Sequence, residues 1–172
     1  MSLSLRLATA ADAEELAGLA TDAFVAAFGH LYRAEDLQAF LTKDRTADSY
    51  RAHLNDPDTR IALGEVDDAL VAYALIHWPS EFASESDASR PLALHQLYCA
   101  GSVTGMGIGA ALMEWALGEA RALGCDAVQL SVYSENYGAQ RFYARYGFAK
   151  IADIEFWVGA HRDAEFLFEL RL

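Results

Sequence analysis

The sequence predicts an α/β fold in which helices flank a mixed β-sheet. Apolar residues recur every second residue in some segments and every three or four residues in others, the periods of strands and helices. A glycine-rich stretch stands where a strand passes into a helix. No repeat or linker divides the chain, so residues 1–172 are expected to form one domain with a sizeable core.

The N-terminal part predicts a strand and then helices. Residues 3–7 alternate apolar and polar side chains, as a half-buried strand does. Residues 9–28 read as an amphipathic helix that Thr9 or Asp12 can cap. Two shorter helices are expected over 33–43 and 47–56, and the second ends where Asp56 precedes a proline.

From residue 59 onwards the chain predicts mostly strands. The acidic pair Asp67-Asp68 marks the turn of a hairpin, Gly124 marks the end of a helix, and Gly147 marks the end of another. The expected strands are 59–66, 69–78, 92–100, 126–134, 148–159 and 164–172, and the expected helices begin after the glycine stretch and at residue 136.

Composition narrows the classes of function. The formal net charge of −12 argues against a nucleic acid or an anionic membrane as partner, because both demand basic surfaces. It is compatible with a cationic substrate, and equally with an acidic surface that only keeps the protein in solution.

Targeting and metal signals are absent from the sequence. The N-terminus lacks the pattern of a secretory signal, and no apolar run reaches the roughly 18 residues of a membrane span. Cys99 and Cys125 have no redox or metal spacing, which favours a reduced, cytoplasmic compartment. The five histidines show no ligand spacing, so we expect no metal.

Gly105, Gly107 and Gly109 pose the central question of the sequence, because glycine weakens a helix start. Bare backbone N–H groups at a helix N-terminus bind anions. A P-loop would need Lys and Ser or Thr after Gly109, where Ala110 and Ala111 stand. The spacing also matches a dinucleotide fingerprint poorly. Glycines present only for close packing remain an alternative.

Two motifs together resemble the GNAT (Gcn5-related N-acetyltransferase) superfamily over about residues 3–172. Thr104-Gly105-Met106-Gly107-Ile108-Gly109 resembles its motif Arg/Gln-x-x-Gly-x-Gly/Ala, with Thr104 in place of Arg or Gln. We expect cofactor binding to survive this difference because the family contacts the pyrophosphate mainly through the backbone. The second motif matches at the following positions: Asn136, Ala139, Phe142, Tyr143, Gly147 and Phe148.

The resemblance implies a mostly antiparallel mixed sheet with two splayed parallel strands that hold acetyl-CoA. Backbone amides from Met106 to Ala110 would bind the pyrophosphate, and the pantetheine arm would lie between strands 94–99 and 128–133. The cofactor-binding residues implied in this way are Leu97, Tyr98, Cys99, Thr104, Gly105, Met106, Gly107, Ile108, Gly109, Ala110, Asn136, Ala139, Phe142 and Tyr143.

The resemblance also implies the acid–base chemistry of acetyl transfer to an amine. Tyr143 is the candidate acid for the leaving thiolate, or else a core aromatic residue. Family members place a Glu where this chain has Ala93 and Ser131, neither of which is a base. His95 is the candidate base because it shares a strand face with Ala93 and histidine is the side chain suited to proton transfer near neutral pH; a packing role for His95 and deprotonation through ordered water are alternatives.

Three further expectations concern the transfer step. Acidic residues such as Glu35 or Asp36 are an additional alternative for the base. The oxyanion donor is expected from a backbone N–H at a strand bulge near Tyr98 or Cys99. Cys99 as an acetylated nucleophile is disfavoured, because a buried strand cysteine is usually inert and the family transfers the acetyl group directly.

The acceptor is open at the level of sequence. Segments 94–99 and 156–170 resemble a bacterial branch that includes spermidine/spermine acetyltransferases, which implies a small amine acceptor. The family resemblance is also compatible with a homodimer formed through the terminal strands. Peptide or lysine acetylation and a non-catalytic acetyl-CoA sensor are the alternatives. The following acids could recruit a polyamine or merely face solvent: Glu35, Asp36, Asp44 and Asp48.

Overall fold

A mixed sheet organises the structure, a computed structural model that describes residues 2–172. Its strand order within these residues is β1-β2-β3-β4-β5-β7-β6. Neighbouring strands are antiparallel except β4 and β5, which run parallel. The strands are β1 (Leu3–Leu7), β2 (Thr59–Val66), β3 (Ala69–His77), β4 (Pro91–Cys99), β5 (Ala127–Tyr133), β6 (Ala149–Val158) and β7 (His161–Arg171).

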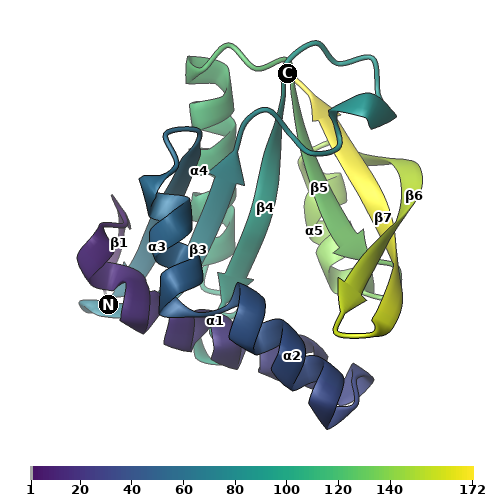
Figure 1. Cartoon of the computed structure of the whole chain (residues 1–172). Helices are drawn as coiled ribbons and strands as arrows, with labels where there is room; N and C mark the ends of the chain where they lie inside the picture. The colour runs from purple at the N-terminus through teal and green to yellow at the C-terminus, as the bar shows by residue number, and fades with distance from the viewer. Residues whose placement is uncertain (1) are drawn as a thin grey trace.

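Helices cover both faces of this sheet (Figure 1). On one face lie α1 (Ala13–Phe28), α2 (Ala34–Asp44) and α3 (Ala47–Asn55). On the other lie α4 (Ile108–Ala122) and α5 (Tyr137–Arg145). Each layer buries an apolar core against the sheet: α4 packs on residues such as Ile76 and Leu92, and α1 with α3 packs on residues such as Leu63 and Leu75.

The α/β class and the mixed sheet predicted from the sequence are confirmed, and so are the individual elements to within a few residues. Asp67 and Asp68 both have positive φ, at 50° and 66°, as the tight turn of the β2–β3 hairpin requires. Gly124 follows α4 with φ of 72°. Within residues 2–172, no helix is long and apolar enough to cross a membrane.

Candidate functional site: a cleft between two splayed strands

The cleft originates in the pairing of β4 with β5. These strands pair over their first residues, with Pro91, Leu92 and Ala93 opposite Ala127, Val128 and Gln129. Figure 1 shows the strands side by side at this end and apart at their arrowheads. A cavity of about 1080 Å³ opens where they separate, and it extends to α1 and α2 on one side and to the glycine loop and α5 on the other.

The glycine loop presents free backbone at one end of this cavity. Gly105 and Gly107 both have φ of 84°, a left-handed conformation that favours glycine, and Gly107 is the N-cap of α4. The first bond of the helix runs from the Ala111 N–H to the Gly107 carbonyl. The N–H groups from Gly107 to Ala110 are therefore left without a helical acceptor, as at any helix start, and can bind an anion.

The backbone amide of Met106 was predicted to bind the pyrophosphate, and the structure corrects this prediction. Its N–H donates to the Val103 carbonyl at 3.2 Å and so closes the turn before the helix. Its side chain is exposed, and Met106 is absent from the residues that line the cavity within the described part of the chain. The other cofactor-binding residues predicted from the sequence line the cavity: Leu97, Tyr98, Cys99, Thr104, Gly105, Gly107, Ile108, Gly109, Ala110, Asn136, Ala139, Phe142 and Tyr143.

The backbone of β4 offers further hydrogen-bonding groups to the cleft. Ala100 N–H donates to the Val71 carbonyl at 2.8 Å on the β3 side. Along an antiparallel pair, the backbone groups of alternate residues bond to the neighbouring strand. The backbone N–H and carbonyl groups of Tyr98 therefore also point toward β3, whereas those of Leu97 and Cys99 point toward the opening between β4 and β5.

The prediction of a strand bulge near Tyr98 or Cys99 is wrong, because the bulge of β4 lies at His95. Gln96 lies opposite Leu75 and Leu94 lies opposite Ile76, so His95 is the extra residue. The bulge therefore lies in the middle of β4, and it places His95 and Gln96 on the same side of the sheet. The His95 side chain contacts residues of the α3 side, and the Gln96 amide accepts hydrogen bonds from two buried tyrosines of that layer.

The second motif forms the start of α5. The Asn136 side chain caps the helix by accepting a hydrogen bond from the Ala139 N–H at 3.2 Å. This cap fixes the first turn of α5, and the following turn carries Phe142 and Tyr143, which line the cavity. The motif residue Asn136 thus has a structural function as well as a position at the cavity wall.

Tyr143 lies among aromatic rings at the open end of the cleft. Its ring centroid is 6.0 Å from that of Phe148 and 6.5 Å from that of Phe168. Burial raises the pKa of the Tyr143 hydroxyl, and the charges of Tyr98 and Cys99 act in the same direction. The hydroxyl therefore stays protonated at neutral pH and can act as an acid.

Glu165 on β7 is a carboxylate that the sequence prediction missed. It is only 9% exposed, and it lines the cavity on the side of β5. Ser131 Oγ donates to Glu165 Oε1 at 3.1 Å, while Oε2 is buried without a hydrogen-bond partner among residues 2–172. Burial raises the pKa of Glu165 to about 7, which suits a group that accepts a proton at neutral pH.

A signal for Glu165 does exist in the sequence. Asp163, Glu165 and Glu169 follow one another at even spacing on the same strand face as Leu167, and all four are buried. Acidic residues on the inward face of a strand are costly unless they serve a purpose. Ser131, one of the positions noted as lacking a base, contributes by bonding this carboxylate.

The far end of the cavity combines aromatic rings with charged groups. Tyr32 OH donates a short hydrogen bond to the Asp163 carboxylate, which joins the segment after α1 to β7. Arg45 is buried, and its guanidinium lies 4.8 Å from the Phe40 ring centroid and 5.6 Å from that of Phe24. This end of the cavity therefore presents both an acidic and a basic group.

The acidic residues that could recruit a cationic acceptor differ in position. Of Glu35, Asp36, Asp44 and Asp48, only Asp44 lines the cavity within residues 2–172. Asp36 instead accepts hydrogen bonds from the Ala160 N–H at 2.9 Å and from Arg33 at 3.0 Å, so it holds the β6–β7 turn against α2. Glu35 and Asp48 are exposed and pair with neighbouring arginines.

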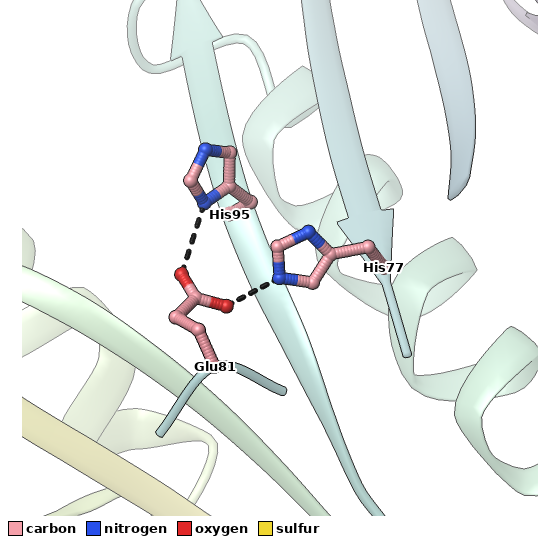
Figure 2. Close-up of side chains that lie close together, drawn as sticks. All are labelled: His77, Glu81 and His95. Carbon is pink, nitrogen blue, oxygen red and sulfur yellow. Dashed lines mark hydrogen bonds and ion pairs between the residues drawn. The ribbon is translucent and has the colours of Figure 1, made fainter. Parts of the chain in front are cut away.

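His95 lines the cavity but has close partners of its own. Its Nδ1 lies 3.2 Å from Glu81 Oε1, and the other carboxylate oxygen makes a short contact with His77 Nε2 (Figure 2). Burial raises the pKa of Glu81, but the hydrogen bonds from His77 and His95 outweigh it and hold that pKa below its usual range. The sequence spacing of the two histidines gave no sign of this cluster.

Cys99 lies at the cavity wall beside the glycine loop, where its Sγ is 3.8 Å from the point a side chain at Gly109 would occupy. Burial raises the pKa of the Cys99 thiol, so it stays protonated and is a poor nucleophile. This agrees with the prediction that Cys99 does not carry the acetyl group.

Comparisons with known proteins agree with the geometry. Residues 22–148 match the model of the acetyltransferase (GNAT) family. An uncharacterized N-acetyltransferase of Mycobacterium tuberculosis is 30% identical over 156 residues, which cover 91% of this chain and 95% of that protein.

Two solved structures share the fold. The PaiA N-acetyltransferase of Thermoplasma acidophilum in complex with coenzyme A has a TM-score of 0.82 at 18% identity, with 100% of both chains covered. NAA60 of Arabidopsis thaliana in complex with acetyl-CoA has a TM-score of 0.77 at 16% identity, with 99% of both chains covered.

Proposed function

Because the chain belongs to the GNAT acetyltransferase family, we propose that its cleft binds acetyl-CoA and passes the acetyl group directly to a primary amine. The observation that carries this proposal is that Glu165 and Tyr143 both line the cavity that opens where β4 and β5 separate. One is a carboxylate with a raised pKa, and the other is a protonated hydroxyl.

The free amides from Gly107 to Ala110 would hold the pyrophosphate of acetyl-CoA at the N-terminus of α4, where the helix dipole favours negative charge. Leu97 and Cys99 would pair with the amides of the pantetheine arm, which then takes the place of the missing neighbour of β4. One of the same N–H groups would stabilise the thioester oxygen as it becomes negative.

In the transfer, we assign proton removal to Glu165. An alkylammonium acceptor has a pKa near 10 and must lose a proton before its nitrogen attacks the thioester carbon. Glu165 takes that proton, and the neutral nitrogen attacks the thioester carbon. As the C–N bond forms and the C–S bond breaks, Tyr143 gives its proton to the departing sulfur, and the second proton that the nitrogen loses restores the Tyr143 hydroxyl.

His95 remains a rival base, because it also lines the cavity. Its Nδ1 already faces Glu81, whereas Glu165 has a carboxylate oxygen without a partner. Oε2 of Glu165 is better placed to accept a proton than Nδ1 of His95, and for this reason we favour Glu165 as the base.

The charge of the cavity favours a cationic acceptor such as a polyamine. The lining carboxylates are Asp44, Glu81, Glu155, Asp163 and Glu165, and they outnumber the lining guanidinium groups of Arg45 and Arg145. Aromatic rings around the far end provide faces that attract an ammonium group.

Arg45 favours a second candidate, a peptide N-terminus or an amino acid. Its Nε is buried without a hydrogen-bond partner in the part of the chain that the structure describes, and the residue lines the cavity. A carbonyl or carboxylate next to the acceptor amine would satisfy this donor. The two candidates therefore differ in whether the acceptor carries an oxygen ligand for Arg45.

A non-catalytic acetyl-CoA sensor is the competing class of function. A sensor has no use for a base and an acid at the acceptor side of the thioester. The buried Glu165 costs free energy whenever it ionises, and this cost is easier to explain if the ionised form has a task in turnover.

The proposal is tested by following free thiol release from acetyl-CoA with spermidine, a short peptide with a free N-terminus, and a lysine peptide with a blocked N-terminus. We expect thiol release that requires an amine and yields one acetylated amine per thiol. Selection of the N-terminal peptide, with loss of that selection in Arg45→Met, would favour the second candidate. Binding of acetyl-CoA without release by any amine would support the sensor, and no binding would overturn the proposal.

A further inference from the structure

We propose that His77, Glu81 and His95 form a binding site for a divalent transition metal, best suited to Zn²⁺, at the edge of the acceptor cavity. His77 ends β3, Glu81 lies four residues later in the loop that follows, and His95 is the bulge residue of β4. Figure 2 shows the two oxygens of the Glu81 carboxylate directed at nitrogens of different imidazole rings, one at His77 and one at His95.

The ligand atoms are already close together. One ring nitrogen of each histidine and one oxygen of Glu81 lie within 4.8 Å of one another. Zinc bonds to nitrogen and oxygen of about 2.0–2.2 Å set tetrahedral ligand atoms about 3.4 Å apart. Small side-chain rotations suffice to close the remaining gap, because all three side chains are partly exposed.

The donor types match a transition metal better than calcium or magnesium. Two imidazoles and one carboxylate are a frequent ligand set of zinc and of non-haem metals, whereas the hard cations prefer oxygen alone. The His77 and His95 rings are stacked with centroids 5.0 Å apart, so a nitrogen of each ring can reach the same carboxylate.

A metal ion bound by His77, Glu81 and His95 would lie beside the acceptor cavity and could influence it. Glu81, His95 and His53 line the cavity, and the His53 ring centroid is 6.2 Å from that of His95. The His53 imidazole is therefore a further nitrogen donor beside the three proposed ligands. The ion would also hold the loop that follows β3 against the sheet.

This inference does not depend on acetyl transfer, and its test therefore reads metal binding. Chelator-treated protein is titrated with ZnSO₄ by calorimetry at pH 7.5, and its melting temperature is followed in parallel. We expect one zinc ion per chain and a rise in melting temperature. His77→Ala and His95→Ala should each weaken binding by at least about 100-fold, because removing a ligand costs more than disturbing its support.

Two further variants make the outcome unambiguous. Glu81→Gln keeps the size of the side chain but removes its charge, and it should also weaken zinc binding while the protein stays folded by circular dichroism. His30→Ala, at a histidine remote from this cluster in sequence and outside the cavity lining of the described chain, should bind as the wild type does. Absence of binding, or binding that survives both His77→Ala and His95→Ala, would overturn the proposal.

Discussion

Ser131 Oγ donates a hydrogen bond of 3.1 Å to Glu165 Oε1, and the second carboxylate oxygen of Glu165 is buried with no partner among the described residues. The two residues lie on neighbouring strands, β5 and β7, at the wall of the cleft. The family resemblance implies a Glu at the position of Ala93 on β4 or Ser131 on β5, where this chain has only the alanine and the serine. The carboxylate of Glu165 reaches the wall of the cleft from the neighbouring strand, β7.

The pH dependence of catalysis should report Glu165. Because its pKa is about 7, kcat/KM should rise with pH through neutrality as the carboxylate becomes ionised. Glu165→Gln should lower kcat/KM about 100-fold or more and remove this rise. A pH–rate profile of both proteins checks this, and an unchanged limb near pH 7 in the variant would point to His95 or another base.

The free energy of unfolding should fall as the pH rises through neutrality, whereas kcat/KM should rise. A carboxyl group whose pKa is raised from 4.5 to about 7 on folding contributes stability below pH 4.5 and loses it as the pH rises to 7. Glu165→Gln should therefore stabilise the protein at pH 8 by up to about 3 kcal/mol and leave it unchanged at pH 4. Urea unfolding at both pH values measures this, with Glu114→Gln on exposed α4 surface as the control.

Tyr143→Phe should separate binding from chemistry. The ring contacts with Phe148 and Phe168 persist, so acetyl-CoA affinity and stability should stay the same. Loss of the proton donor should lower kcat about 100-fold. Tyr146→Phe, which changes a neighbouring tyrosine of the same segment outside the cavity lining of residues 2–172, should keep full activity, and equal activity in both variants would remove Tyr143 from the mechanism.

Asp36→Ala should loosen the acceptor end of the cavity. The variant leaves the Ala160 N–H without its acceptor and frees Arg33, so the β6–β7 turn is no longer held against α2. We expect a melting temperature several degrees lower and a higher KM for the amine, with the affinity for acetyl-CoA retained. Glu35→Ala, at an exposed neighbour, serves as the control, and equal KM values in the two variants would show that this link does not shape the acceptor site.

Local features of the fold were predictable because short segments specify them. The turn at Asp67-Asp68, the end of α4 before Gly124 and the glycines at its start each follow from backbone conformations that few residues accept. The cofactor side of the cleft is built mainly from such segments. For this reason most of the predicted cofactor-binding residues line the cavity, with Met106 as the exception.

The acceptor side could not be predicted in the same way, because it is assembled from distant segments. Glu165 meets Ser131 through the pairing of β5 with β7, and His77 meets His95 through the pairing of β3 with β4. The bulge at His95 shifts the register of β4 by one residue, which changes the side of the sheet on which its following side chains lie. A strand pattern read from the sequence alone does not contain such a shift.

The central claim is that the glycine loop and the splayed strands bind acetyl-CoA, and calorimetric titration of acetyl-CoA tests it most directly. The wild type should bind one equivalent, and Gly107→Ala should bind at least about tenfold more weakly, because alanine at φ of 84° costs roughly 1–2 kcal/mol and disturbs the start of α4. Gly118→Ala, a substitution within α4 that meets nothing within 4 Å, should bind normally. No binding to the wild type, or equal affinity in Gly107→Ala, would contradict the claim.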